Sequence, residues 1–118
     1  MSWFSNKSNF AWLKLDDNSS IQQIIEDSKE FPQIIFKHST RCSISSMALN
    51  RFERDWDQNV KVKLYYLDLI AFRTLSNEIA EKLKVEHQSP QVILIMNGLV
   101  RYTASHNGIE ATEISKLL

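Results

Sequence analysis

An uninterrupted apolar segment at residues 33–37 places the strongest limit on the fold of this 118-residue chain. Its Ile34, Ile35 and Phe36 do not alternate with polar residues, and this pattern is typical of a strand whose two faces are both covered by helices. Strands of this kind lie in the interior of α/β sheets. The sequence therefore predicts that residues 33–37 form the central strand of such a sheet.

The remaining segments can be ordered around this strand by their hydrophobic periodicity. Apolar residues at helical spacing predict helices over 21–28, 43–57, 75–83 and 110–118, and compact or alternating apolar segments predict strands at 11–15, 60–66, 92–96 and 99–103. Asn97-Gly98 predicts a tight hairpin between the last two strands. The order β-α-β-α-β-α-β-β-α requires parallel pairing at the crossovers and antiparallel pairing at the hairpin, so the sheet is expected to be mixed.

Three local patterns give finer expectations. Ile44, Met47, Ala48, Phe52 and Trp56 form one stripe of the helix at 43–57, which we interpret as core packing. The alternation over 60–66 predicts a strand with unlike faces, followed by a connection over 68–72. Pro32 is expected to end the helix that begins near residue 21.

Length and composition predict a single domain over residues 1–118, with residues 1–10 forming a loose N-terminal arm. Lys plus Arg and Asp plus Glu are balanced at 14 each, so no summed field attracts nucleic acid or an anionic membrane surface. The N-terminal residues contain no apolar signal-peptide core, and no segment approaches the length of a membrane span. We therefore expect a cytoplasmic protein.

Cys42 is the only cysteine of the chain, and it lies at the predicted turn from the central strand into the next helix. The first N–H groups of a helix carry partial positive charge, and together with the nearby Arg41 and Lys37 they favour the nucleophilic thiolate. The alternative is that Cys42 is a small apolar filler of the core. A single cysteine cannot form an internal disulfide, which fits a reducing compartment and requires any sulfur partner to come from another molecule.

Other polar residues near the turn have weaker signals. His38 is more often a solvated residue at a strand end than a proton carrier, and Thr40 and Ser43 are candidates for hydrogen bonds to the helix end or to the thiolate. Cys42 with the three histidines His38, His87 and His106 does not have a zinc-site spacing, so we expect no metal site. The two glycines form no phosphate-binding loop.

Several motifs together resemble the monothiol bacilliredoxin family, small thioredoxin-like proteins of bacteria that produce bacillithiol. The resemblance spans about residue 18 to the C-terminus and rests on Phe36-Lys37-His38-Ser39-Thr40-Arg41-Cys42-Ser43-Ile44-Ser45, Tyr66-Leu67-Asp68-Leu69, Ser76-Asn77 with Ile79-Ala80, and His87-Gln88-Ser89-Pro90-Gln91. It implies a thioredoxin-like α/β fold with a mixed central sheet flanked by helices. One departure is Ser43, which stands where the family usually has proline and leaves the reaction rate open.

The resemblance also implies a site around the sulfur. Cys42 would be the catalytic residue, and Thr40, Arg41, Ser43, Ser89 and Pro90 would bind substrate, with Arg41 facing a carboxylate of bacillithiol. The Ser89–Pro90 bond would be cis, so that the Ser89 backbone can pair with the peptide-like part of a bound thiol.

The implied function is an enzyme activity, thiol–disulfide exchange that removes bacillithiol from S-bacillithiolated cytosolic proteins. Bacillithiol would be the co-substrate, and a second low-molecular-weight thiol or a disulfide reductase would regenerate Cys42. The alternative is a thioredoxin-fold binding or regulatory module in which Cys42 is only a site of thiol modification. The sequence leaves open the client proteins, the reductant, the oligomeric state, and whether the small thiol is bacillithiol, glutathione or coenzyme A.

Overall fold

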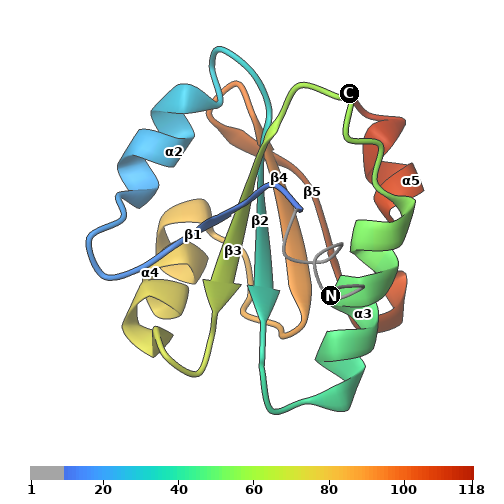
Figure 1. Cartoon of the computed structure of the whole chain (residues 1–118). Helices are drawn as coiled ribbons and strands as arrows, with labels where there is room; N and C mark the ends of the chain where they lie inside the picture. The colour runs from blue at the N-terminus through green and yellow to red at the C-terminus, as the bar shows by residue number, and fades with distance from the viewer. Residues whose placement is uncertain (1–9) are drawn as a thin grey trace.

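The computed structural model describes residues 10–118 of the chain. Five strands form one sheet and helices cover both of its faces (Figure 1). The elements in chain order are β1 (Trp12–Lys14), α2 (Ile21–Asp27), β2 (Gln33–His38), α3 (Ser43–Asp55), β3 (Lys63–Asp68), α4 (Arg73–Leu83), β4 (Gln91–Met96), β5 (Leu99–Ser105), the 3₁₀ helix η1 (His106–Gly108) and α5 (Ala111–Ser115). The predicted order of strands and helices is confirmed, and η1 is the one element of this order that the sequence did not predict.

The strand β2 occupies the centre of the sheet, whose order is β1-β3-β2-β4-β5. It pairs in parallel with β3 and antiparallel with β4, while β5 returns along β4 through the predicted hairpin. Asn97 and Gly98 have φ angles of 54° and 81°, as a type I′ turn requires at both central positions. The expected mixed sheet is therefore confirmed.

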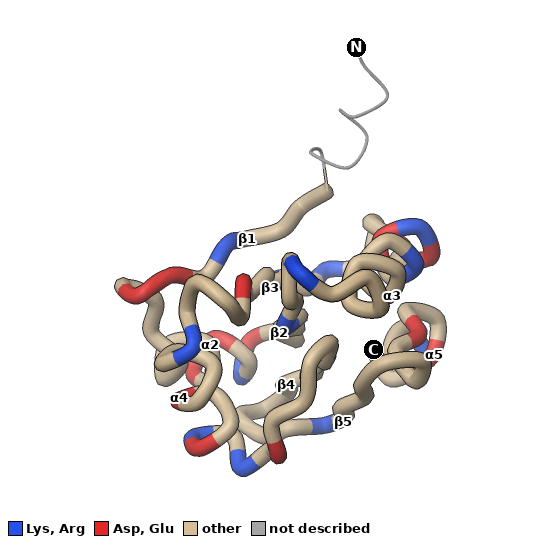
Figure 2. Tube along the Cα trace, turned by 90° about the horizontal axis from the view of Figure 1, so that it is seen from below, with Lys and Arg blue, Asp and Glu red and all other residues tan. Residues whose placement is uncertain are grey.

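The two faces of the sheet have separate cores. Helices α3 and α5 cover one face and α2 and α4 cover the other, as the view along the strands shows (Figure 2). Alternate residues of β2 enter the two cores, because successive side chains of a strand point to opposite faces. Phe36 packs in the core beneath α3, whereas Ile35 packs in the core beneath α2 and α4.

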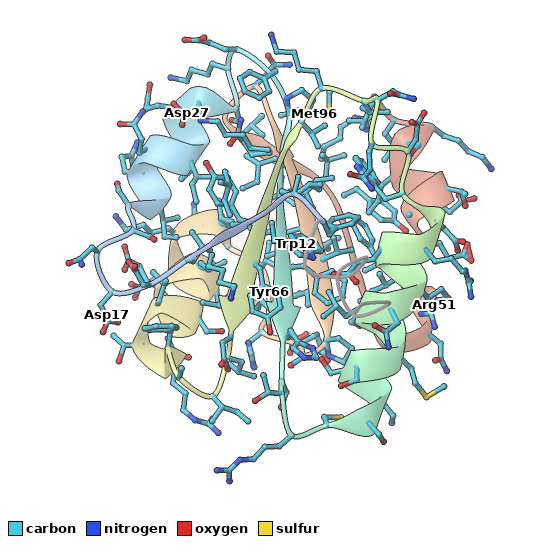
Figure 3. The ribbon with its side chains drawn as sticks, in the orientation of Figure 1. Trp12, Asp17, Asp27, Arg51, Tyr66 and Met96 are labelled. Atoms are coloured by element: carbon cyan, nitrogen blue, oxygen red, sulfur yellow. The ribbon has the colours of Figure 1, made fainter. Side chains whose placement is uncertain are left out.

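Aromatic rings fill much of the core beneath α3. Trp12 lies against Phe52 with ring centroids 5.8 Å apart, and Phe52 stacks on Trp56 at 5.4 Å. Trp12 and Tyr66 extend from neighbouring strands toward this helix (Figure 3). The indole N–H of Trp12 donates a hydrogen bond to Glu53 of α3 (2.6 Å), so the edge strand β1 is tied to the helix by packing and by a polar contact.

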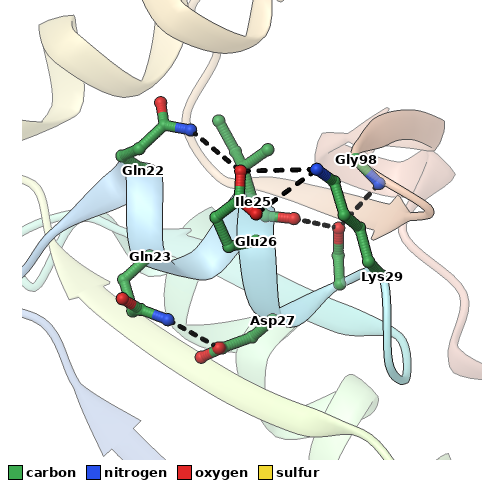
Figure 4. Close-up of polar contacts among 8 residues, drawn as sticks. Gln22, Gln23, Ile25, Glu26, Asp27, Lys29 and Gly98 are labelled. Atoms are coloured by element: carbon green, nitrogen blue, oxygen red, sulfur yellow. Dashed lines mark hydrogen bonds and ion pairs between the residues drawn. The ribbon is translucent and has the colours of Figure 1, made fainter.

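The C-terminal end of α2 is held by the β4–β5 hairpin. Ser20 caps the start of this helix by accepting a hydrogen bond from the Gln23 N–H (3.1 Å). At the other end, the Ser28 hydroxyl donates to the Ile25 carbonyl (2.6 Å) and accepts from the Gly98 N–H (2.8 Å; Figure 4). The helix therefore ends at Asp27, and the expectation that Pro32 ends it is wrong.

Two other expectations about local structure are wrong. The strand predicted over 60–66 begins only at Lys63 and continues to Asp68, and both of its faces are covered, since Leu64 and Leu67 are buried in different cores. The alternation of apolar residues before Lys63 reflects packing of the preceding loop against the core. The last helix ends at Ser115, and Leu118, expected on its buried face, is 39% exposed.

The stripe predicted on α3 is only partly buried. Ala48, Phe52 and Trp56 are buried as expected, but Ile44 and Met47 are 51% and 65% exposed. The physical reason is that Ser45, Ala48 and Phe52 form the buried face of α3, so that at about 100° per residue Met47 points away from the sheet and Ile44 lies at the margin of the buried face. The apolar stripe of α3 is therefore wider than the face of the helix that the core covers.

The expected loose arm over residues 1–10 lies outside the described residues except for Phe10. This residue is buried and its ring centroid is 5.0 Å from that of Trp12, so it belongs to the core rather than to an arm. No helix within residues 10–118 has the length and apolar character needed to cross a membrane.

The aromatic core predicts the cost of a cavity. Phe52→Ala removes a fully buried ring that contacts three other rings, and we expect it to lower the free energy of unfolding by about 3–5 kcal/mol. Leu99→Ala, at a side chain that is 72% exposed, should change it by less than about 0.5 kcal/mol. Urea denaturation of both variants measures these values, and equal losses would contradict this account of the core.

Candidate functional site

The sulfur of Cys42 lies where the central strand passes into α3. β2 ends at His38, residues 39–41 form the turn, and Cys42 is the N-cap residue of α3. The Cys42 N–H closes the turn by donating to the Ser39 carbonyl (3.2 Å). The predicted placement at a strand-to-helix turn is confirmed, and the residue is partly exposed rather than sealed in the core.

The residues flanking Cys42 are open to solvent. Thr40, Arg41 and Ser43 are exposed, as is the apolar pair Ile44 and Met47 in the first two turns of α3. Cys42 itself is the N-cap, so neither Thr40 nor Ser43 occupies that position. The first N–H groups of α3 carry partial positive charge near Cys42, and the exposed Arg41 precedes Cys42 in the chain.

His38 is buried, in contrast to the solvated position expected for it. Only 5% of the residue is exposed, and its Nδ1 lies 2.7 Å from the Ser45 hydroxyl of α3. Its ring packs against Tyr66 with a centroid distance of 5.6 Å. Burial lowers the pKa of His38, with the nearby Asp68 and the contact to Ser45 opposing this shift, so the imidazole is neutral at pH 7. Because β2 is the central strand, even its last residue is covered.

Lys37 points to the opposite face of the sheet, away from Cys42. It is fully buried, and its Nζ lies 3.2 Å from Nδ1 of His87, which is also 3.4 Å from the Ser76 hydroxyl of α4. Among the salt bridges of the described residues, none involves Lys37. The expectation that Lys37 lies beside the sulfur is therefore wrong, because successive residues of a strand face opposite sides.

Within the described part of the chain Lys37 forms no salt bridge, and this has an electrostatic consequence. Burial lowers the pKa of its ammonium group to about 8. The pKa of His87 is lowered as well, by burial first and then by the charges of Lys37 and Arg73. A neutral His87 can therefore accept a hydrogen bond from the Lys37 ammonium at pH 7.

The Ser89–Pro90 segment lies at the same end of the sheet as Cys42, beyond the last residue of β2. β4 runs antiparallel to β2 and begins at Gln91, which pairs with Lys37, so Pro90 lies opposite the end of β2. The Ser89–Pro90 bond is cis, as the resemblance implied. The Ser89 hydroxyl is buried and has no hydrogen-bond partner among the described residues.

Side-chain hydrogen bonds of Gln91 hold the segment before Pro90 in place. Its amide group donates to the Glu86 carbonyl (3.0 Å) and accepts from the Gln88 N–H (3.3 Å). Together with the contact between His87 and Lys37, these bonds attach the segment to the sheet. The fold thus brings Cys42 and Pro90, which are distant in the sequence, to the same end of the sheet.

The motifs that carry the resemblance include Ser45, Ser76 and His87, but sequence reasoning assigned none of the three a role in this region. Ser45 could have been noticed as a small polar residue in the first turn of a helix, on the side facing the sheet. No local signal indicates the contacts of His87, because its partners Lys37 and Ser76 are 50 and 11 residues away in the sequence. Within residues 10–118, no group of three or more His, Cys, Asp or Glu side chains is arranged to hold a metal ion.

Comparison with solved structures identifies the fold class. A thioredoxin-fold protein with a provisional assignment as an oxidoreductase is 31% identical, with a TM-score of 0.73, over 90% of this chain and 92% of that chain. Thioredoxin from Malassezia sympodialis is 18% identical (TM-score 0.62; 88% and 84% covered), and spinach chloroplast thioredoxin f is 12% identical (TM-score 0.66; 92% and 90% covered). The protein therefore has the thioredoxin fold that the sequence predicted.

A sequence profile of the monothiol bacilliredoxin BrxC matches residues 13–114. The chain belongs to the monothiol bacilliredoxin family, and the resemblance noted from the sequence is confirmed. Family and fold together define a thiol oxidoreductase.

The buried ammonium of Lys37 predicts a pH dependence of stability. Its pKa is about 8 in the folded protein and 10.5 ordinarily, so between these values the unfolded chain binds more protons and stability rises with pH. From pH 7 to 9.5 this adds roughly 1–2 kcal/mol to the free energy of unfolding. The upper limit of pH 9.5 matters because burial raises the pKa values of Tyr65 and Tyr66, which act in the opposite direction at higher pH.

Lys37→Met should abolish this pH-dependent increment and stabilise the protein most at pH 7, since it removes a buried charge without a carboxylate partner. Denaturation at pH 7.0 and 9.5 measures the effect. Lys14→Met, at an exposed position of β1, serves as the charge-matched control. Parallel pH dependences for the wild type and Lys37→Met would show that Lys37 is not the group responsible.

Proposed function

We propose that this protein removes bacillithiol from S-bacillithiolated cytosolic proteins and that Cys42 is the nucleophile. Membership of the monothiol bacilliredoxin family supports the substrate class. The observation that carries the proposal is the position of the sole cysteine, partly exposed at the start of α3 and at the same end of the sheet as Pro90.

The reaction consists of two thiol–disulfide exchanges. The Cys42 thiolate attacks the bacillithiol sulfur of the mixed disulfide, forms a disulfide with it and releases the client cysteine as a thiolate. A second thiolate, from a low-molecular-weight thiol or a reductase, then attacks the Cys42-bound sulfur and frees Cys42. In the first step the client cysteine is reduced and Cys42 is oxidised to the same extent, so no external oxidant or reductant is needed. The second step is intermolecular because the sequence contains one cysteine.

Groups around the sulfur have separate parts in this scheme. The helix N-terminus stabilises the thiolate, and the exposed Arg41 offers a positive charge to the carboxylates in the malate portion of bacillithiol. Ser89 and Pro90, at the same end of the sheet as Cys42, would provide backbone for the peptide-like part of the thiol, and the Ser89 hydroxyl has no hydrogen-bond partner within residues 10–118. Thr40 and Ser43 border the approach, and the exposed Ile44 and Met47 offer apolar surface for the client.

Turnover tests the assignment of Cys42. Release of the client thiol from a bacillithiolated protein, followed with excess bacillithiol as the reductant, should be at least about 100-fold slower for Cys42→Ala, since no other thiol can replace it. Mass spectrometry of the wild type should detect bacillithiol on Cys42. Equal rates for the two proteins would leave only the alternative, a binding module whose cysteine is modified without turnover.

The charge on Arg41 predicts selectivity among small thiols. Arg41→Ala should lower kcat/KM about fivefold for a bacillithiol mixed disulfide, because one exposed charge pair contributes about 1 kcal/mol. The same substitution should leave the rate with a cysteamine mixed disulfide unchanged or higher, since cysteamine carries no carboxylate. Arg54→Ala, near the far end of α3, is the control. An equal loss with both substrates would rule out carboxylate recognition by Arg41.

A further inference from the structure

His38, Ser45 and Ser39 form a continuous chain of hydrogen bonds beside the sulfur. The Ser39 N–H donates to the Ser45 hydroxyl oxygen (3.0 Å), and that oxygen lies 2.7 Å from Nδ1 of His38. Since Ser45 accepts from Ser39, its own hydrogen is free to donate to Nδ1. A neutral His38 that carries its proton on Nε2 satisfies every group in this chain.

The chain of hydrogen bonds reaches Cys42 through Ser39. The Ser39 N–H is held by Ser45, and the Ser39 carbonyl accepts from the Cys42 N–H (3.2 Å). Ser45 lies in the first turn of the helix that Cys42 caps. The turn carrying the sulfur is therefore attached at both ends, to the strand through His38 and to the helix through Ser45.

The surroundings of His38 keep its ring in one orientation. Tyr66 of β3 packs on the ring, and Asp68 lies opposite His38 in the parallel register of β2 and β3. The Leu69 N–H that follows Asp68 donates to the His38 carbonyl (2.9 Å). On the other side, the β4 residues opposite the end of β2 are uncharged, so Asp68 and Tyr66 are the titratable groups that face His38.

We propose that His38 is a positioning residue for Cys42: through its Nδ1 acceptor it orients Ser45, which holds the turn that presents the sulfur. The inference rests on the proposed function only in taking Cys42 as the reacting group. A turn that is no longer held presents the sulfur to an attacking reagent for a smaller fraction of the time, so the effect is expected on the rate at which the thiolate reacts.

The pH dependence of Cys42 alkylation by iodoacetamide tests this. The plateau at high pH is the rate of the thiolate itself, and the midpoint shows the pH at which half of the thiol is ionised. His38→Phe keeps a ring that can pack on Tyr66 but has no acceptor, and Ser45→Ala removes the hydroxyl. Both should lower the plateau rate about five- to tenfold. His38→Asn places an amide oxygen near the position of Nδ1 and should restore most of the rate lost in His38→Phe. Ser46→Ala, the next residue of α3, is the matched control.

The proposal is overturned if folded His38→Phe and Ser45→Ala react at the wild-type plateau rate, or if His38→Asn loses as much as His38→Phe. Should these variants fail to fold, ¹⁵N NMR of the wild-type ring decides: a proton on Nε2 supports the proposal, and a proton on Nδ1 overturns it. Alkylation involves neither client nor bacillithiol. A protein that does not release bacillithiol from its clients therefore refutes the proposed function alone, while the pattern among the variants still tests His38.

Discussion

Burial of the central strand on both faces is the constraint on which the rest of the structure depends. β2 is covered along its whole length, from Gln33 to His38, by helices on each side of the sheet and by β3 and β4 at its edges. The two cores meet at this strand through Phe36 and Ile35. Every segment near Cys42 is positioned relative to the end of β2.

The end of β2 is polar although it is buried, and this requires specific partners. Lys37 finds His87 on one face, and His38 finds Ser45 on the other. Buried polar groups without partners cost free energy, so these two contacts limit where the segment before Pro90 and the first turn of α3 can lie. Two adjacent residues of one strand thereby hold the two segments that flank the candidate site.

This arrangement connects fold and proposed chemistry. The sulfur lies at the start of α3, where Cys42 is partly exposed, and Ile44 and Met47 lie outside the buried face of the same helix. The proposed exchange requires such access to the sulfur. Ser39 is hydrogen-bonded to both Ser45 and Cys42, and these bonds attach the turn to α3 beneath an otherwise open surface.

The order of the elements, the mixed sheet, the Asn97-Gly98 hairpin and the position of Cys42 at a helix start could all be predicted from the sequence, because periodicity and turn chemistry act between residues that are close in the chain. Only the tertiary structure decided that Lys37 and His38 are buried and that Ile44 and Met47 are exposed. Burial depends on where the sheet ends relative to its helices, and the partners of the buried groups, such as His87 for Lys37, come from distant parts of the chain. A local sequence pattern contains neither the position of the end of the sheet nor the identity of a distant partner.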